Sequence, residues 1–190
     1  MVWGDHTRTI AGAAVVVLSI VGLSACAPAS SAESSITLAQ TKSPVQLLRN
    51  EAASRIGNIV VGSVDTTGDA SRACKTEEAD PLGRSRQWMS SVSVSLAAGN
   101  AWRIDEVTQQ LADSFTEQGW TAERGMQADV SFTGLKSDTS SATIGLTSTA
   151  GDDAAGLPAT LVITTEGPCV MTGGAESDEV KKLEKVVVAQ

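Results

Sequence analysis

The chain has no tyrosine, only two phenylalanines and a single histidine, His6. A serine–histidine–aspartate triad and a cysteine–histidine pair both need an imidazole, so neither kind of catalysis is indicated. The scarcity of histidine also removes the commonest ligand of zinc and iron. Because carbohydrate clefts commonly stack sugars on aromatic rings, an aromatic content of 3% counts against a glycosidase.

Several motifs that would carry chemistry are missing as well. The sequence contains no Ser-x-x-Lys of the β-lactamase type, no phosphate-binding loop, no dinucleotide fingerprint and no EF-hand spacing. We therefore predict no catalytic residue, no metal ligand and no cofactor, and we expect that the protein is not an enzyme.

Positive charge is also in short supply. Fourteen lysines and arginines face 22 aspartates and glutamates, which gives a net charge of −8. An acidic protein is not a nucleic-acid binder on electrostatic grounds. It is also repelled by an anionic membrane surface, so surface charge cannot hold it on a membrane.

The first residues have the organisation of a secretory signal. A charged start is followed by an apolar run over residues 10–23, which is shorter than the roughly 20 residues that a transmembrane helix needs. The run ends in Leu23-Ser24-Ala25-Cys26, which resembles the lipobox of bacterial lipoproteins. Two alternatives stay open, namely an uncleaved anchor helix and a plain signal that is cut near Ala25 or Ala32.

The resemblance implies a lipid anchor. In such proteins the thiol of the lipobox cysteine, here Cys26, receives a diacylglyceryl group, and a peptidase cuts before it. Residues 1–25 would then be a signal peptide, and His6 would leave with it. Two acyl chains would hold the protein on the extracytoplasmic face of the cell membrane, since a single chain binds only marginally.

The cysteine count supports a disulfide bond. The chain has three cysteines. If Cys26 is lipidated, Cys74 and Cys169 remain in an oxidising compartment, where we expect them to pair. Two buried free thiols are the alternative.

The remaining chain suits one domain. We expect residues 26–42, which are rich in serine and alanine, to be a flexible tether, and residues 43–190 to form a single extracytoplasmic α+β domain. A capping box predicts a helix that begins at Ser43 and ends before Gly57, and an apolar stripe predicts a helix over 101–118. Alternation or β-branched residues predict strands over 58–64, 87–97, 120–124, 130–136, 142–148 and 159–165, with Val130 and Phe132 facing inward.

These elements predict a two-layer fold, with a mostly antiparallel sheet of about five or six strands and two helices on one face. The residues 177–188 form either a short helix or a frayed tail. The plan resembles small actinobacterial membrane-anchored lipoproteins of unassigned function. That likeness depends on the anchor, the two later cysteines and the pattern around Trp88 and Gly119-Trp120.

A polar stretch over residues 65–86 lacks periodicity and contains Cys74. We expect it to be a long loop fixed by the disulfide, and such loops commonly carry recognition. Its charges of both signs suit a protein partner in the cell envelope. The candidate partner surface comprises Arg72, Lys75, Glu77, Glu78, Asp80, Arg84 and Arg86. Alternatively, the loop covers a sheet edge, its acids bind calcium, or its arginines hold an anion.

The sequence therefore favours a lipid-anchored, non-catalytic binding or assembly module. One alternative is a carrier of a small or lipidic ligand in a cavity between helices and sheet, with Trp102 as a ligand contact and with Trp88 and Trp120 packed in the core. Another is a hydrolase that uses only carboxylates, from Glu77, Glu78 and Asp80 or from Asp152 and Asp153.

Overall fold

The computed structural model describes residues 36–185, except for residues 59, 128 and 129. The expected signal segment, the lipobox-like Leu23-Ser24-Ala25-Cys26 and most of the expected tether lie outside the described residues. The elements run α1 (Leu38–Ser54), β1 (Val61–Ala73), β2 (Ser85–Leu96), a 3-10 turn η1 (Ala101–Arg103), α2 (Ile104–Thr116), β3 (Thr121–Gln127), β4 (Val130–Ser137), β5 (Ser140–Thr149), β6 (Thr160–Glu166), β7 (Val170–Met171) and α3 (Asp178–Lys185). Within these residues no helix is both long and apolar enough to span a bilayer.

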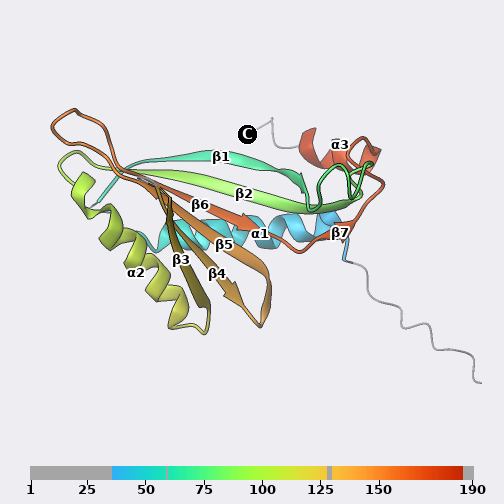
Figure 1. The fold of residues 1–190 in the computed structure, drawn as a ribbon, viewed down its shortest axis with the longest axis horizontal. Coiled ribbons are helices and arrows are strands. Elements are labelled where there is room, and N and C mark those ends of the chain that lie inside the picture. The colour runs from blue at the N-terminus through green and yellow to red at the C-terminus, as the bar shows by residue number, and fades with distance from the viewer. Residues whose placement is uncertain (1–35, 59, 128–129, 186–190) are drawn as a thin grey trace, which may run out of the picture. The chain divides into compact units, whose positions relative to one another are not determined.

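The strands form one antiparallel sheet (Figure 1). Their order is β1-β2-β6-β5-β4-β3, and the short β7 pairs with the start of β2. The predicted α+β class with an antiparallel sheet is confirmed. The described part of the chain holds seven strands and three α-helices, which is more than expected, because the segment after Cys169 adds β7 and α3.

The core lies between the sheet and helices α1 and α2. α1 packs mainly on β2 and β6, while α2 packs on β5 and its neighbours. The predicted alternation in β2 is confirmed, because Trp88, Val92, Val94 and Leu96 are all buried. The predicted stripe of α2 is confirmed in the same way, by the burial of Ile104, Val107, Leu111 and Phe115.

Helix α1 begins earlier than the sequence predicted. A capping box formed by Thr37 and Gln40 starts it, and Pro44 lies inside the helix rather than at its first position. The extra turns are stabilised by tertiary contacts, since Leu38 is buried with Trp88 in a second apolar cluster. The last five residues of the expected tether are therefore helical.

The expected long loop over 65–86 is wrong in its bounds. Residues up to Ala73 belong to β1, and β2 already begins at Ser85, so the loop proper covers 74–84. β1 is an edge strand with two register irregularities against β2. An edge strand with much of its surface exposed needs no apolar alternation, which is why its polar sequence resembled a loop.

The face of β4 was also predicted wrongly. Thr133 and Leu135 point into the core, whereas Phe132 is 49% exposed on the outer face. Phe132 lies directly opposite Gly125 of β3, and a Cβ on that glycine would come within 2.1 Å of the phenyl ring. The ring covers the backbone of the glycine. β3 therefore continues through Gly125 to Gln127, three residues beyond the strand predicted over 120–124.

Candidate functional site

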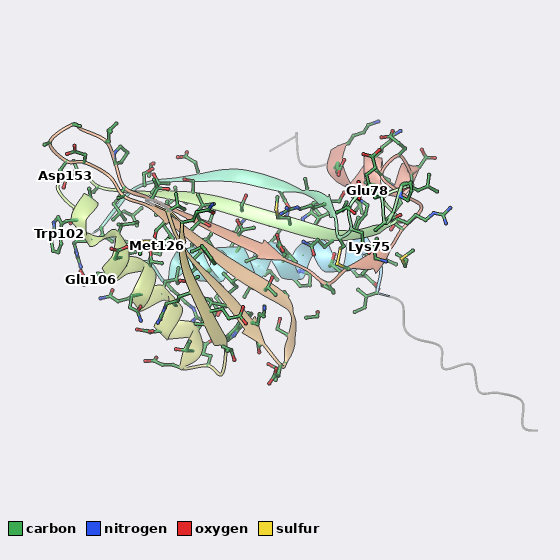
Figure 2. The ribbon with its side chains drawn as sticks, viewed as in Figure 1. Lys75, Glu78, Trp102, Glu106, Met126 and Asp153 are labelled. Carbon is green, nitrogen blue, oxygen red and sulfur yellow. A yellow bond between two sulfur atoms is a disulfide. The ribbon has the colours of Figure 1, made fainter. Side chains whose placement is uncertain are left out.

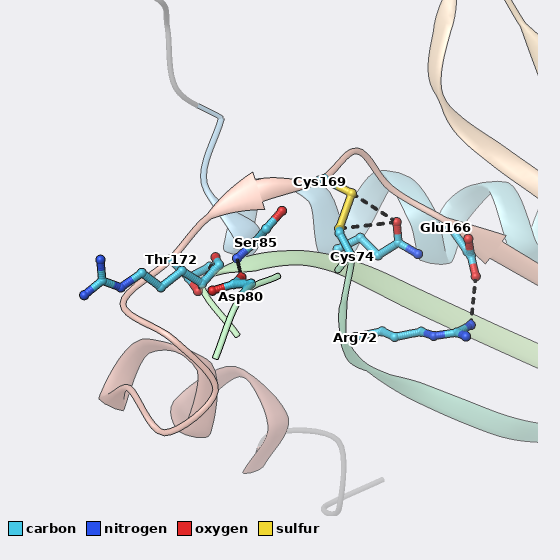
Figure 3. The surroundings of a disulfide bond; sticks show 9 residues. Arg72, Cys74, Asp80, Ser85, Glu166, Cys169 and Thr172 are labelled. Carbon is cyan, nitrogen blue, oxygen red and sulfur yellow. Dashed lines mark hydrogen bonds and ion pairs between the residues drawn. A yellow bond between two sulfur atoms is a disulfide. The ribbon is translucent and has the colours of Figure 1, made fainter. Parts of the chain in front are cut away.

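The candidate site is formed by two loops that lie side by side near the start of β2. One is the β1–β2 loop (74–84) and the other is the β7–α3 loop (172–177). The predicted disulfide between Cys74 and Cys169 is confirmed, with Cα atoms 6.2 Å apart (Figure 3). It joins the first residue of the β1–β2 loop to the residue before β7, and β7 itself pairs with Ser85 and Arg86.

Backbone hydrogen bonds hold the two loops against each other. The carbonyl oxygen of Arg84 accepts from the nitrogen of Thr172 at 2.8 Å and from its hydroxyl at 3.0 Å. The nitrogen of Ala175 donates to the carbonyl oxygen of Leu82 at 3.1 Å. The loop is therefore fixed by the disulfide and by its neighbour, which is a more extensive restraint than the sequence predicted.

The closeness of the loops depends on Gly174. Its φ angle is +109°, and a Cβ at this position would lie 2.6 Å from the carbonyl oxygen of Leu82. Only glycine both adopts this backbone conformation readily and leaves room for the neighbouring backbone.

Between the loops lies a hollow of about 520 Å³, which we call the inter-loop cleft. One wall comes from the end of β1, the β1–β2 loop and the start of β2, and the other comes from the β7–α3 loop. The lining residues include Lys75, Glu77, Asp80, Leu82, Gly83, Arg86, Gly174 and Glu176.

Two of the carboxylates that line the cleft are engaged by the protein itself. The carboxylate of Asp80 accepts a hydrogen bond from the nitrogen of Ser85 at 2.7 Å. This bond, with a second from the backbone of Arg84, lowers the pKa of Asp80 below its ordinary value. Glu176 pairs with Lys181 at 2.8 Å, and the pairing lowers the pKa of Glu176 and raises the pKa of Lys181. Both carboxyl groups are therefore ionised at neutral pH.

Arg86 is the unusual member of the site. It is 8% exposed, although the sequence indicated a surface residue. Its Nε donates to the hydroxyl of Ser71 at 3.0 Å, and its Nη2 donates to the carbonyl oxygen of Ser71 at 3.1 Å. Neither partner carries a charge, and Arg86 takes part in none of the ion pairs of the described residues.

The structure brings together four of the seven residues predicted for the partner surface. Lys75, Glu77, Asp80 and Arg86 line the inter-loop cleft. Glu78 is exposed on the same loop, near Lys75 in Figure 2, and Arg84 is exposed at the end of the loop.

Arg72 does not belong with these residues. It lies on the outer face of β1, where it pairs with Glu166 of β6 at 3.5 Å. There it lines a separate shallow hollow on the sheet face that α1 and α2 leave uncovered.

The opposite wall of the cleft escaped the sequence analysis. Residues 173–177 lie almost 100 positions from the β1–β2 loop, and only the predicted pairing of Cys74 with Cys169 indicated that the two segments are neighbours. The Gly173-Gly174 pair just after Cys169 was the local signal for a tight approach.

Trp102 and Asp153 lie at the other end of the sheet from Lys75 and Glu78 (Figure 2). Trp102 is 74% exposed and its indole nitrogen donates to the carbonyl oxygen of Gly99 at 3.2 Å. Trp88 is fully buried, as predicted, and Trp120 packs edge to face on Phe115.

The acidic pair in the β5–β6 loop has a structural role. Asp152 accepts from two backbone nitrogens of its own loop, and Asp153 accepts from the nitrogens of Gly99 and Ala101. In the part of the chain that the structure describes, no three histidine, cysteine or acidic side chains gather closely enough to hold a metal ion.

Comparison with protein-family models, with curated proteins and with solved structures found no match to this chain.

Proposed function

We propose that this protein is a lipid-anchored, non-catalytic recognition module of the cell envelope, which binds a protein partner through the inter-loop cleft and its rim. The observation that carries the proposal is the fixed cleft: two loops joined by a disulfide and by hydrogen bonds, with charges of both signs around a hollow of about 520 Å³. Loops that a rigid scaffold holds in place are common recognition sites.

The acids of the cleft support a binding role over hydrolysis. A carboxylate-only glycosidase needs one carboxyl group with a raised pKa as the proton donor. Asp80 and Glu176 have lowered pKa values, and their partners hold them as anions. Neither group is suited to donate a proton at neutral pH.

The packing of the domain supports recognition at the surface over carriage of a ligand inside. A carrier of the kind considered above needs an open space between the helices and the sheet. The main core cluster occupies that layer, with buried side chains from α1, from α2 and from the four strands β2, β4, β5 and β6. The inter-loop cleft lies outside that layer, between the two loops.

Photo-crosslinking in cells tests the partner surface. A photoreactive residue at Glu78, on the rim of the β1–β2 loop, should capture one envelope protein. The matched control is Asp138, an exposed acidic residue in the β4–β5 turn, which should capture nothing specific. Capture of one protein from the control position, with none from Glu78, would place the partner surface elsewhere.

The anchor is tested separately. Cys26→Ala should abolish incorporation of a labelled fatty acid and leave an uncleaved precursor or a released protein. Normal lipid labelling of this variant would contradict the lipidation of Cys26.

A further inference from the structure

We propose that the inter-loop cleft binds a carboxylate group of the partner, and that this carboxylate pairs with the guanidinium of Arg86. The inference deepens the proposed function and rests on it for the identity of the partner as a protein. Its starting point is a buried positive charge whose two hydrogen-bond partners are neutral.

A buried charge without a counter-ion is costly, because the loss of hydration is not offset by attraction to an opposite charge. Arg86 is in this position. The nearest acidic group in its hydrogen-bond network is Glu184, which it reaches only through Ser71, since the Ser71 hydroxyl donates to the Glu184 carboxylate at 2.6 Å. An anion in the cleft would supply the missing counter-charge.

The guanidinium also has donors to spare. It carries five N–H groups, and the two bonds to Ser71 engage one on Nε and one on Nη2. The remaining donors are on Nη1 and on the second N–H of Nη2, which form the end of the planar fork. A carboxylate matches this pair of parallel donors with its two oxygens.

The fork is accessible from the cleft because of Gly83. Both residues line the hollow, and a Cβ on Gly83 would lie 3.3 Å from Nη1 of Arg86. Gly83 has a φ angle of +56°, so glycine is favoured there on backbone grounds as well. The absence of a side chain leaves Nη1 uncovered on that side.

The other charges of the cleft are compatible with an incoming carboxylate. Asp80 and Glu176 are already engaged, by Ser85 and Lys181 respectively. Lys75 is exposed on the rim and takes part in none of the ion pairs of the described residues, so it is available as a second cation. Glu77 and Asp80 are the acids of the lining that oppose the anion, since the hydrogen bond from Ser85 leaves the negative charge of Asp80 in place.

The test is an NMR titration of the purified full-length protein with its arginine side chains labelled. N-acetylglycine mimics a C-terminal carboxylate, the α-amide of N-acetylaspartate mimics a side-chain carboxylate, and N-acetylglycinamide is the uncharged control. We expect a saturable shift of the Arg86 guanidinium signal with one or both acids and none with the amide. The acid that binds identifies the source of the carboxylate.

Variants separate a specific site from general attraction. Arg86→Lys keeps the charge and loses the fork, so the affinity for the acid should fall by about tenfold. Arg124→Gln removes an exposed arginine of β3, which pairs with Asp113 and does not line the cleft, and should leave the affinity unchanged. Should Arg86→Lys fail to fold, the titration of the unaltered protein still decides the matter.

Two results would overturn the proposal: no saturable shift of the Arg86 signal with either acid, or saturation by inorganic phosphate alone. The outcome is independent of the crosslinking experiment. Capture from Glu78 without any shift of the Arg86 signal would support the partner surface and contradict the carboxylate site. A saturable shift of the Arg86 signal without capture from Glu78 would support the carboxylate site and contradict the proposed partner surface.

Discussion

Thr172 donates two hydrogen bonds to the carbonyl oxygen of Arg84, from its backbone nitrogen at 2.8 Å and from its hydroxyl at 3.0 Å. Thr172, which directly follows β7, thus holds Arg84, the last residue of the β1–β2 loop. Because the disulfide holds the first residue of that loop at Cys74, the loop is restrained at both ends. The width of the inter-loop cleft depends on these two restraints.

The first prediction concerns the hydroxyl of Thr172. Thr172→Val keeps the shape and the backbone bond but removes the bond that the hydroxyl donates to Arg84 and the bond that it accepts from the nitrogen of Gly174. Their loss should lower the free energy of unfolding by about 1–2 kcal/mol. Urea unfolding measures the change. Thr149→Val, at an exposed position at the end of β5, is the matched control and should have a much smaller effect. Equal losses in the two variants would contradict a specific role for the Thr172 hydroxyl.

A second prediction concerns the close approach of the loops at Gly174. Gly174→Ala places a methyl group 2.6 Å from the carbonyl oxygen of Leu82 and should cost more than about 3 kcal/mol of unfolding free energy. Gly156→Ala is the control, since Gly156 also has a positive φ angle but nothing within 4 Å of the added carbon. Its cost should be only the backbone penalty of about 1–2 kcal/mol. Urea unfolding measures both variants, and similar unfolding midpoints for the two would show that the loops have room to separate.

The third prediction concerns the disulfide. Cys74 and Cys169 are 95 positions apart, and the chain-entropy treatment gives a stabilisation of about 4–5 kcal/mol for closing a loop of that size. The double variant Cys74→Ser/Cys169→Ser should lose several kcal/mol, with the largest rise in hydrogen exchange in the β1–β2 loop. If exchange rises equally throughout the sheet, the bond stabilises the whole fold and has no special role at the cleft.

Elements with one buried face were predictable from the sequence. Trp88, Val92 and Val94 alternate with serines in β2, and Ile104 and Leu111 recur at helical spacing in α2. In both elements the buried side chains recur with the period of the secondary structure, so the local sequence is sufficient to predict the element and its buried face. The disulfide was predictable for a different reason, from the count of cysteines.

Other features depend on contacts that the local sequence does not contain. α1 begins at the capping box of Thr37 and Gln40 and not at the predicted one of Ser43 and Gln46, because the earlier start buries Leu38 beside Trp88. The side chain of Gln46 donates to Asp69 of β1 instead. Phe132 lies on the outer face because it covers Gly125 on a neighbouring strand. The second wall of the cleft comes from a segment that is distant in the sequence, so only the wall formed by the β1–β2 loop could be predicted.

The last prediction concerns pH and the carboxylate of Asp80. The hydrogen bond from the nitrogen of Ser85, with the weaker contribution of the Arg84 backbone, lowers the pKa of Asp80 in the folded state below its ordinary value of 3.8. A carboxyl group whose pKa is lower in the folded than in the unfolded protein stabilises the fold above the unfolded value, and this contribution is lost as the pH falls through the folded value. Asp80→Asn should therefore lower stability at pH 6, and the difference from the parent protein should shrink as the pH falls through the folded-state pKa and the carboxyl group becomes protonated in both states. Urea unfolding of the two proteins across this range should give curves that converge in acid. Glu78→Gln makes the same charge change on the same loop at a side chain that is not bonded to Ser85, and it serves as the control. Parallel curves for the parent protein and Asp80→Asn would mean that the Asp80–Ser85 bond does not couple protonation to folding.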